Sequence, residues 1–142
     1  MEKERARAAA KNYEDPIQKN KNASDEAYDA ALDYCVANLA DISICAGTHN
    51  ENSSMHLVNL MAQHGIASND RRVYFSQLLG MSDNLSYNLS EAGYNVAKYV
   101  PYGPVKKVLP YLFRRAEENT AIAGQMGREL SLIVAEQRRR KG

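Results

Sequence analysis

The fold is decided most directly by residues 94–120, which read YNVAKYVPYGPVKKVLPYLFRRAEENT. The first part of this stretch, 94–100, predicts a strand, and Pro101-Tyr102-Gly103-Pro104 predicts a turn. Pro104 would then take the first position of a helix, where its missing N–H is not needed. We expect this helix to run from about Val105 to Thr120.

Two earlier stretches repeat the pattern of a strand followed by a helix. The predicted strands are 42–46 and 72–79, and the predicted helices that follow them are 50–64 and 83–92. Leu57, Leu60 and Met61 give the first of these helices its apolar spacing. Gly65 suits the left-handed position that commonly ends a helix, and Gly93 closes the second one.

Helical spacing is also found before the first strand and at the end of the chain. Residues 1–10 predict a helix, and 18–23 predicts a loop. Ser24 is the expected N-cap of the next helix. The apolar positions of that helix are Tyr28, Leu32, Cys35 and Leu39. A last helix is expected over 128–140.

Strands that alternate with helices at this spacing predict an α/β fold with a parallel sheet. Only three strands are counted, and so small a parallel sheet leaves both edges unpaired. The chain also opens with a helix that no strand precedes. This pattern resembles the later part of a (β/α)₈ barrel, which takes about 250 residues. We therefore expect residues 1–142 to be the C-terminal half of a barrel, with three parallel strands alternating with helices and a C-terminal helix.

Composition and charge narrow the class of protein. The chain is 44% hydrophobic and 25% charged, which is typical of a globular protein. A net charge of +1, without interleaved aromatic and basic residues, argues against a nucleic-acid-binding module. No apolar run approaches the roughly 20 residues of a membrane span, and the first residues do not resemble a signal peptide. We expect a cytoplasmic protein, or one on the inner face of a membrane, in which Cys35 and Cys45 are buried thiols.

The helix predicted at 105–120 has two different faces. Its apolar stripe, which we expect to pack on the sheet, consists of Val105, Val108, Leu109, Leu112 and Ala116. A separate arc carries Tyr111, Arg114, Arg115 and Glu118. Two guanidiniums beside an aromatic ring could grip a small carboxylate, because the planar fork of arginine pairs with it through two hydrogen bonds. A solvated face with an Arg114–Glu118 pair gives the same pattern, and spacing alone favours that reading.

Polar residues directly follow the first predicted strand. Gly47-Thr48-His49-Asn50 lies at the strand end where barrels build their active sites. The Thr48 hydroxyl and the His49 imidazole could bind a cofactor, although a histidine at a strand end is more often a structural cap. Leu78, at the end of the next strand, would lie near the same mouth. No metal site is expected, because no acidic residue joins His49 and His56 from a matching face.

These stretches resemble the proline dehydrogenase family. Residues 92–104 and 110–119 are similar to the family's last strand and the helix after it, and YLFRRAEEN at 111–119 is the most specific motif. Further similarities are found in GTHN at 47–50, FSQLLGM at 75–81, ERARA at 4–8 and YEDPI at 13–17. The resemblance covers essentially the whole chain, in the family's order.

The resemblance implies a reaction and a way of holding its substrate. The family has a distorted (β/α)₈ barrel that binds FAD and oxidises L-proline to Δ1-pyrroline-5-carboxylate, the first step of proline degradation to glutamate. By the motif match, Arg114 and Arg115 would ion-pair with the proline carboxylate, and Glu118 would belong to the polar network that orients them.

The same resemblance implies the rest of the pocket. Tyr99, Tyr111 and Leu78 would pack around the pyrrolidine ring, and Thr48 and His49 would lie against the flavin. Hydride would pass from proline C5 to flavin N5 while the protein positions the two groups. The reduced flavin would pass its electrons to a quinone, usually at a membrane.

The chain departs from the family in length. The family's earlier strands, with a lysine and an aspartate of the substrate site and an arginine that contacts the flavin, have no counterpart here. A half-barrel would leave the flavin and the sheet edges open, so we expect little activity from this chain alone. The alternative is an inactive half-barrel that serves as a folding or interaction module, or that completes a barrel with a separate chain. The basic run at 138–141 would touch a membrane or form a solvated helix end, and the second is favoured.

Overall fold

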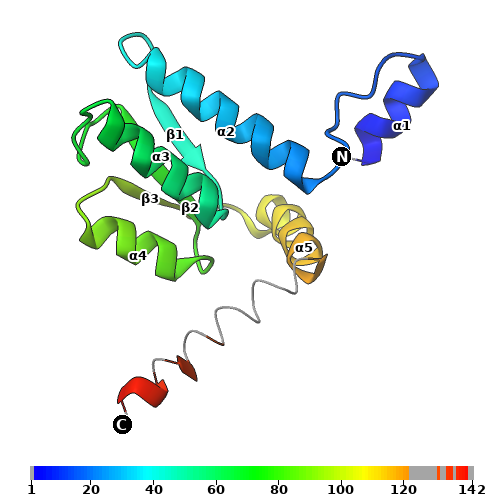
Figure 1. Ribbon diagram of the computed structural model, residues 1–142. Helices are drawn as coiled ribbons and strands as arrows, with labels where there is room; N and C mark the ends of the chain where they lie inside the picture. Colours follow the sequence, from blue (N-terminus) through cyan, green and yellow to red (C-terminus); the bar gives the residue numbers. More distant parts are fainter. Residues whose placement is uncertain (1, 122–130, 132–133, 136, 141–142) are drawn as a thin grey trace.

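The computed structural model describes residues 2–121, 131, 134–135 and 137–140 (Figure 1). Its elements, in chain order, are α1 (Glu2–Lys11), α2 (Lys21–Ala37), β1 (Ile44–Gly47), α3 (Glu51–Gln63), β2 (Val73–Leu78), α4 (Asp83–Glu91), β3 (Val96–Tyr99) and α5 (Val105–Ala121). Each strand is followed by a helix, as the sequence predicts.

The strands form one parallel sheet in the order β1-β2-β3. Gly47 at the end of β1 pairs with Ser76, and Leu78 at the end of β2 pairs with Tyr99 at the end of β3. The predicted α/β fold with a parallel sheet is therefore confirmed. Because parallel strands run in the same direction, their carboxyl ends meet at one edge of the sheet.

The hydrophobic core lies between one face of this sheet and the helices α2, α3 and α4 (Figure 1). Alternate residues along a strand point to the same face, and those that point into the core are Ile44, Ala46, Val73 and Phe75. The helices contribute Leu32, Val36, Leu57, Leu60, Met61, Leu85 and Leu89. The side chains of Leu57 and Phe75 are fully buried, so this layer is packed like the interior of an ordinary domain.

The other face of the sheet is open. Its residues alternate with those of the core, and Cys45 and Tyr74, which are register partners, are exposed on it. The prediction that Cys45 is buried is therefore wrong, because its position in β1 turns it away from the helical layer. Cys35, from α2, is half-buried against the core.

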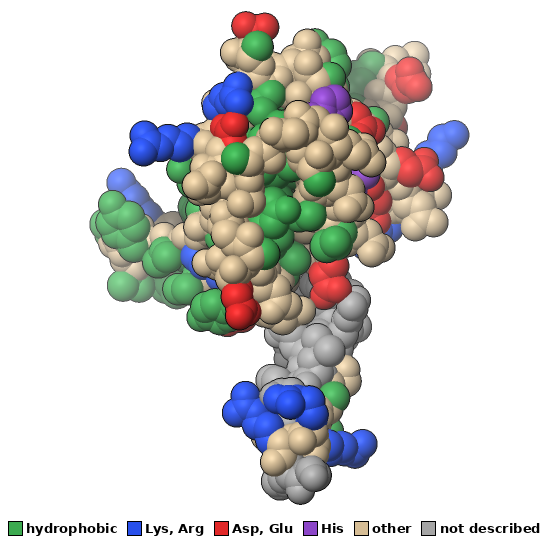
Figure 2. All heavy atoms as spheres, turned by 60° about the vertical axis from the view of Figure 1, so that its left-hand side comes forward, with side chains coloured by type: hydrophobic (Ala, Val, Ile, Leu, Met, Phe, Trp, Pro, Cys, Tyr) green, Lys and Arg blue, Asp and Glu red, His purple; other side chains and the backbone are tan. Residues whose placement is uncertain are grey.

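The predicted packing of α5 on the sheet is also wrong. Figure 1 shows α5 beyond the carboxyl ends of the strands, while α2, α3 and α4 occupy the covered face. Val105, Leu109 and Leu112 of the predicted stripe are exposed, and Figure 2 shows hydrophobic side chains gathered at its lower left, where this helix projects. The connection 100–104, with its two prolines, carries the chain past the strand ends instead of back along the sheet. The side chain of Ala116, the last member of the stripe, lies outside the described part.

The ends of two helices differ from their predicted positions. The Asn20 Oδ1 accepts a hydrogen bond from the Ala23 N–H at 2.8 Å, so Asn20 is the N-cap of α2 and the predicted cap Ser24 is wrong. The predicted loop at 18–23 accordingly ends at residue 20. Pro104 precedes α5, and its carbonyl accepts from the Val108 N–H at 3.1 Å, so it takes the N-cap position and not the first helical one. Gly65 follows α3 with a φ of 64°, as predicted.

The helix predicted over 128–140 lies partly outside the described residues. Those of its residues that the structure does describe, 131, 134–135 and 137–140, are helical. Among all described residues, no helix combines the length and the apolar character that crossing a membrane requires.

Candidate functional site

The predicted site residues lie at the ends of the three strands or in the segments that follow them. Thr48 and His49 follow β1, Leu78 ends β2, and Tyr99 ends β3. The arginines lie on α5, the helix that the chain forms next. Because the strands are parallel, all these segments start from the same edge of the sheet.

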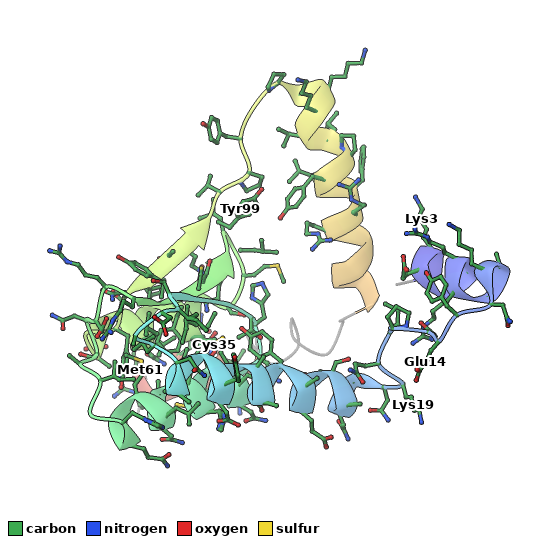
Figure 3. All side chains as sticks on the ribbon, turned by 90° about the horizontal axis from the view of Figure 1, so that it is seen from above. Lys3, Glu14, Lys19, Cys35, Met61 and Tyr99 are labelled. Carbon is green, nitrogen blue, oxygen red and sulfur yellow. The ribbon has the colours of Figure 1, made fainter. Side chains whose placement is uncertain are left out.

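Leu78, Tyr99, Tyr111 and Arg115 form a continuous group, which we call the arginine–tyrosine group. Leu78 and Tyr99 are register partners on neighbouring strands. The rings of Tyr99 and Tyr111 meet edge to face with their centroids 5.8 Å apart, and the Arg115 Cζ lies 5.4 Å from the centroid of the Tyr111 ring. Figure 3 shows Tyr99 at the end of β3, on the side that faces α5. Tyr99 therefore connects the sheet to the helix that carries the arginines.

The arrangement of this group suits a small anion with an apolar body. A guanidinium over an aromatic face is held in place by the ring's quadrupole, which leaves its N–H groups able to pair at the edge of its plane. Arg115 is half-buried, whereas Arg114 next to it is exposed. The side chain of Glu118 lies outside the described part, so neither its predicted role beside the arginines nor an Arg114–Glu118 pair is tested.

Thr48 and His49 lie in a turn that is built by short-range hydrogen bonds. The Thr48 N–H continues the sheet by donating to the Ser76 carbonyl at 3.2 Å, and the Thr48 Oγ1 accepts from the Asn50 N–H at 3.0 Å. Asn50 then caps α3, with its Oδ1 accepting from the Asn52 N–H at 3.0 Å. Both Thr48 and His49 are half-buried. The turn thus fixes the backbone on which the imidazole stands.

Three residues that the sequence did not single out hold this turn from the β2 side. Gln77 is only 2% exposed, and its Nε2 donates to the Thr48 carbonyl at 3.3 Å. The Ser86 Oγ donates to the Gln77 Oε1 at 2.9 Å. The Ser82 Oγ lies 2.9 Å from the His49 Nδ1. The sequence offers a signal for Gln77 alone, because it is a polar residue at an inward position of β2 whose other inward residues, Val73 and Phe75, are apolar.

Lys98 of β3 holds the loop between β2 and α4 from the other side. Its Nζ donates to the Met81 carbonyl and to the Asp83 Oδ1, both at 2.8 Å. The loop, residues 79–82, is therefore tied to both neighbouring strands. Among the residues that the structure describes, no three His, Cys, Asp or Glu side chains gather closely enough to hold a metal ion.

Comparisons with known proteins find similar sequences over almost the whole chain. The family model described as Proline dehydrogenase matches residues 1–128. "Proline dehydrogenase 1, mitochondrial" of Homo sapiens is 45% identical over 143 residues, covering 99% of this chain and 24% of that protein. "Hydroxyproline dehydrogenase" of Xenopus laevis is 42% identical over 144 residues, covering 99% of this chain and 31% of that protein.

A solved structure is similar over most of the fold. Proline utilization A from Bdellovibrio bacteriovorus, inactivated by N-propargylglycine, matches with a TM-score of 0.75 and 25% sequence identity. The match covers 84% of this chain and 12% of that one. The chain thus spans between 24% and 31% of the length of the two relatives above, and a smaller share of the solved structure.

Proposed function

Because the chain belongs to the proline dehydrogenase family, we propose that residues 1–142 form the later part of a (β/α)₈ catalytic domain that oxidises L-proline to Δ1-pyrroline-5-carboxylate. The observation that carries the proposal is the arginine–tyrosine group. It joins a cation, two aromatic rings and an aliphatic side chain at the carboxyl ends of the strands, which is where barrels bind their substrates.

Different residues of the arginine–tyrosine group bind the carboxylate and the ring of proline. Arg114 and Arg115 pair with the carboxylate, and Arg115 also lies over the ring of Tyr111. Leu78, Tyr99 and Tyr111 pack against the apolar pyrrolidine ring and exclude water from it. Glu118 is proposed to complete the polar network around the guanidiniums. These residues bind and orient the substrate, which fixes the position of its C5.

The end of β1 fits a flat cofactor, which we propose to be FAD. Gly47 lies on the open face, and apart from its chain neighbours no described atom lies within 4 Å of the position where a Cβ would stand. Its register partner Ser76 is also small. Thr48 and His49, at the rim of this surface, carry the hydroxyl and the ring nitrogens that can hydrogen-bond a polar heterocycle. When bound, FAD supplies the redox chemistry that side chains lack.

The route of the electrons beyond the flavin is proposed from the family alone. We propose a quinone or another membrane-associated acceptor, with the protein in the cytoplasm or peripheral to the inner face of a membrane. The described basic residues 138–140 are exposed and suit contact with an anionic surface, although a solvated helix end has the same charges.

A chimera tests the proposed reaction. The matching segment of the human relative is replaced by residues 1–142, and the reduction of a dye is measured with proline and FAD. Proline-dependent turnover is expected, and hydroxyproline is assayed in parallel because the Xenopus relative carries that name. A folded chimera that binds FAD but oxidises neither compound would contradict the proposal.

Substitutions in the chimera test the carboxylate assignment. Arg114→Met and Arg115→Met should each raise the KM for proline about 25-fold or more, because losing one partner of a desolvated charge pair costs about 2–5 kcal/mol. Arg71→Met is the matched control, since Arg71 is exposed at the opposite end of the sheet, before β2. If both α5 variants keep the KM of the control, the carboxylate is held elsewhere.

A further inference from the structure

Ser82 has a backbone conformation that residues with a side chain rarely adopt. Its φ of 50° and ψ of 44° lie in the left-handed region, where the Cβ crowds the neighbouring carbonyl. Together with Asn12, it is one of two non-glycine residues with positive φ among those described. Such strain persists only where surrounding contacts impose it, and it is concentrated at functional sites.

Ser82 also does not use its hydroxyl in the way its position favours. It is the N-cap of α4, where a serine oxygen normally accepts from a backbone N–H of the first turn. No such bond is formed. The Oγ lies instead 2.9 Å from the Nδ1 of His49, which is 33 residues away in sequence. The hydroxyl therefore contacts the segment after β1 instead of capping its own helix.

A second link joins the same two segments. The buried Gln77 accepts from Ser86 in the first turns of α4 and donates to the Thr48 carbonyl. The Ser86 Oγ is also 3.1 Å from the Ser82 carbonyl. The backbone at Thr48 and the ring of His49 are thus both held by the start of α4, the backbone through Gln77 and the ring through Ser82.

Lys98 adds two further contacts to the loop that carries Ser82. Its two contacts, with the Met81 carbonyl and Asp83, lie on either side of Ser82 in sequence. They hold the residues on both sides of Ser82, and so support the loop that presents the hydroxyl.

We propose that Ser82 is a positioning residue for His49. The hydrogen bond between its hydroxyl and the His49 Nδ1, with 2.9 Å between the two atoms, fixes the orientation of the imidazole. The left-handed backbone brings the hydroxyl within reach. The link itself is independent of the reaction, whereas its value for holding a flavin against His49 rests on the proposed function.

The test uses the full chain, without flavin, and reads the ring directly. Long-range ¹H–¹⁵N spectra are recorded at about pH 8, where an imidazole of ordinary pKa is neutral, and the His49 signals are assigned with His49→Gln. Ser82→Ala removes the hydroxyl and keeps the strain. Ser82→Gly removes the hydroxyl and adopts a φ of 50° without strain, so it stays folded. In both variants the His49 nitrogen shifts should change, most of all that of Nδ1, because this nitrogen loses the hydroxyl that lies 2.9 Å from it.

The controls lie in the same chain. His56 and His64 should keep their shifts in both variants, and Ser90→Ala, an exposed position on α4, should leave His49 unchanged. Unchanged His49 signals in Ser82→Gly would overturn the proposal, because the hydroxyl would then form no hydrogen bond that orients the ring.

The affinity for FAD, measured in the chimera, separates this inference from the proposed function. Ser82→Ala and Ser82→Gly should each weaken FAD about threefold to tenfold, the worth of one neutral hydrogen bond. If the unsubstituted chimera binds no FAD, the proposed function fails, while the spectra of the chain without flavin still test the hydrogen bond between Ser82 and His49. If FAD binds and the His49 signals do not move, the inference fails and the function stands.

Discussion

Arg114 and Arg115 are adjacent in sequence and lie in different surroundings. Arg115 is half-buried over the ring of Tyr111, and Arg114 is exposed. A helix turns by about 100° per residue, so the two side chains leave the helix in different directions. Tyr111 precedes Arg115 by four residues and lies on the same side of the helix, which is why it orders this arginine. The two side chains should therefore respond differently to conservative substitution.

Arg115→Lys in the chimera should raise the KM for proline about tenfold or more. An ammonium keeps the charge but can neither stack its plane on Tyr111 nor form two parallel hydrogen bonds with a carboxylate. Each of these losses is worth roughly 1 kcal/mol. Arg114→Lys should raise the KM less, because no stacking is lost. Steady-state kinetics with varied proline measure both, and equal KM values for Arg115→Lys and the unsubstituted chimera would contradict the assignment.

Asp70 should make the fold sensitive to acid. Its two carboxylate oxygens accept from the Arg72 backbone and guanidinium at 2.6–3.0 Å, and these hydrogen bonds lower its pKa from about 3.8 to about 2. A carboxyl group whose pKa is lowered by folding stabilises the fold above its unfolded pKa. That stabilisation is lost as the pH falls through the folded pKa. The lost stability should therefore appear between about pH 4 and pH 2.

Urea unfolding of the chain between about pH 7 and pH 2 measures this contribution. Asp70→Asn should be less stable than the unsubstituted chain at neutral pH, and the difference should shrink as the pH approaches about 2. Asp41→Asn is the control, since Asp41 is an exposed carboxylate with no side-chain hydrogen bond or ion pair described. A difference between Asp70→Asn and the unsubstituted chain that stays constant down to the lowest pH would contradict the pKa shift.

Part of the candidate site follows from the sequence and part does not. The spacing of the arginines and Tyr111 on one helix favours a solvated face, and only the resemblance of YLFRRAEEN to a family motif makes them site candidates. The strand ends of a parallel sheet direct attention to Thr48, His49 and Leu78. Gln77 and Ser82 are different, because their partners are 29 and 33 residues away. A serine before a helix predicts a cap, and nothing local shows that its hydroxyl is used elsewhere.

The helices and strands themselves are predicted well because their apolar periods are strong. Where these elements end and how they pack is harder to predict, because more than one cap residue and more than one packing surface suit the same sequence. Asn20 and Ser24 are both good N-cap residues, and only the backbone decides that α2 begins at Lys21. The apolar stripe of α5 predicts an amphipathic helix, but it does not say which surface the stripe meets. The path of 100–104 past the strand ends decides that.

Asn20→Ala should lower the free energy of unfolding by about 1 kcal/mol, the usual contribution of an N-cap side chain. Ser24→Ala is the matched control and should change it by less than about 0.5 kcal/mol, as surface substitutions usually do. Circular dichroism during urea unfolding measures both. A larger loss for Ser24→Ala than for Asn20→Ala would show that the cap lies at the position first predicted from the sequence.

The molecule as a whole has one well-packed layer and one open side. The core between the sheet and α2–α4 contains fully buried residues, whereas the opposite face of the sheet and much of α5 face solvent. Val105, Leu109, Leu112 and Phe113 are all exposed on α5. Apolar groups gathered at a surface commonly mark a place where other protein covers it. The arginine–tyrosine group stands at this open side, so its chemistry depends on what covers it.

The isolated chain should therefore oxidise proline poorly. A guanidinium–carboxylate pair in contact with water is worth at most about 1 kcal/mol, whereas binding at a millimolar Kd takes about 4 kcal/mol. With FAD and proline added, kcat/KM for dye reduction should fall below about one hundredth of the value for the chimera, the factor that about 3 kcal/mol gives. Hydrogen exchange serves as the control for folding: slowly exchanging amides in β2, next to the fully buried Phe75, would show that the core is intact. Turnover by the isolated chain within about tenfold of the chimera would mean that the open side already binds proline, and that water does not weaken the pairing of the arginines with the carboxylate.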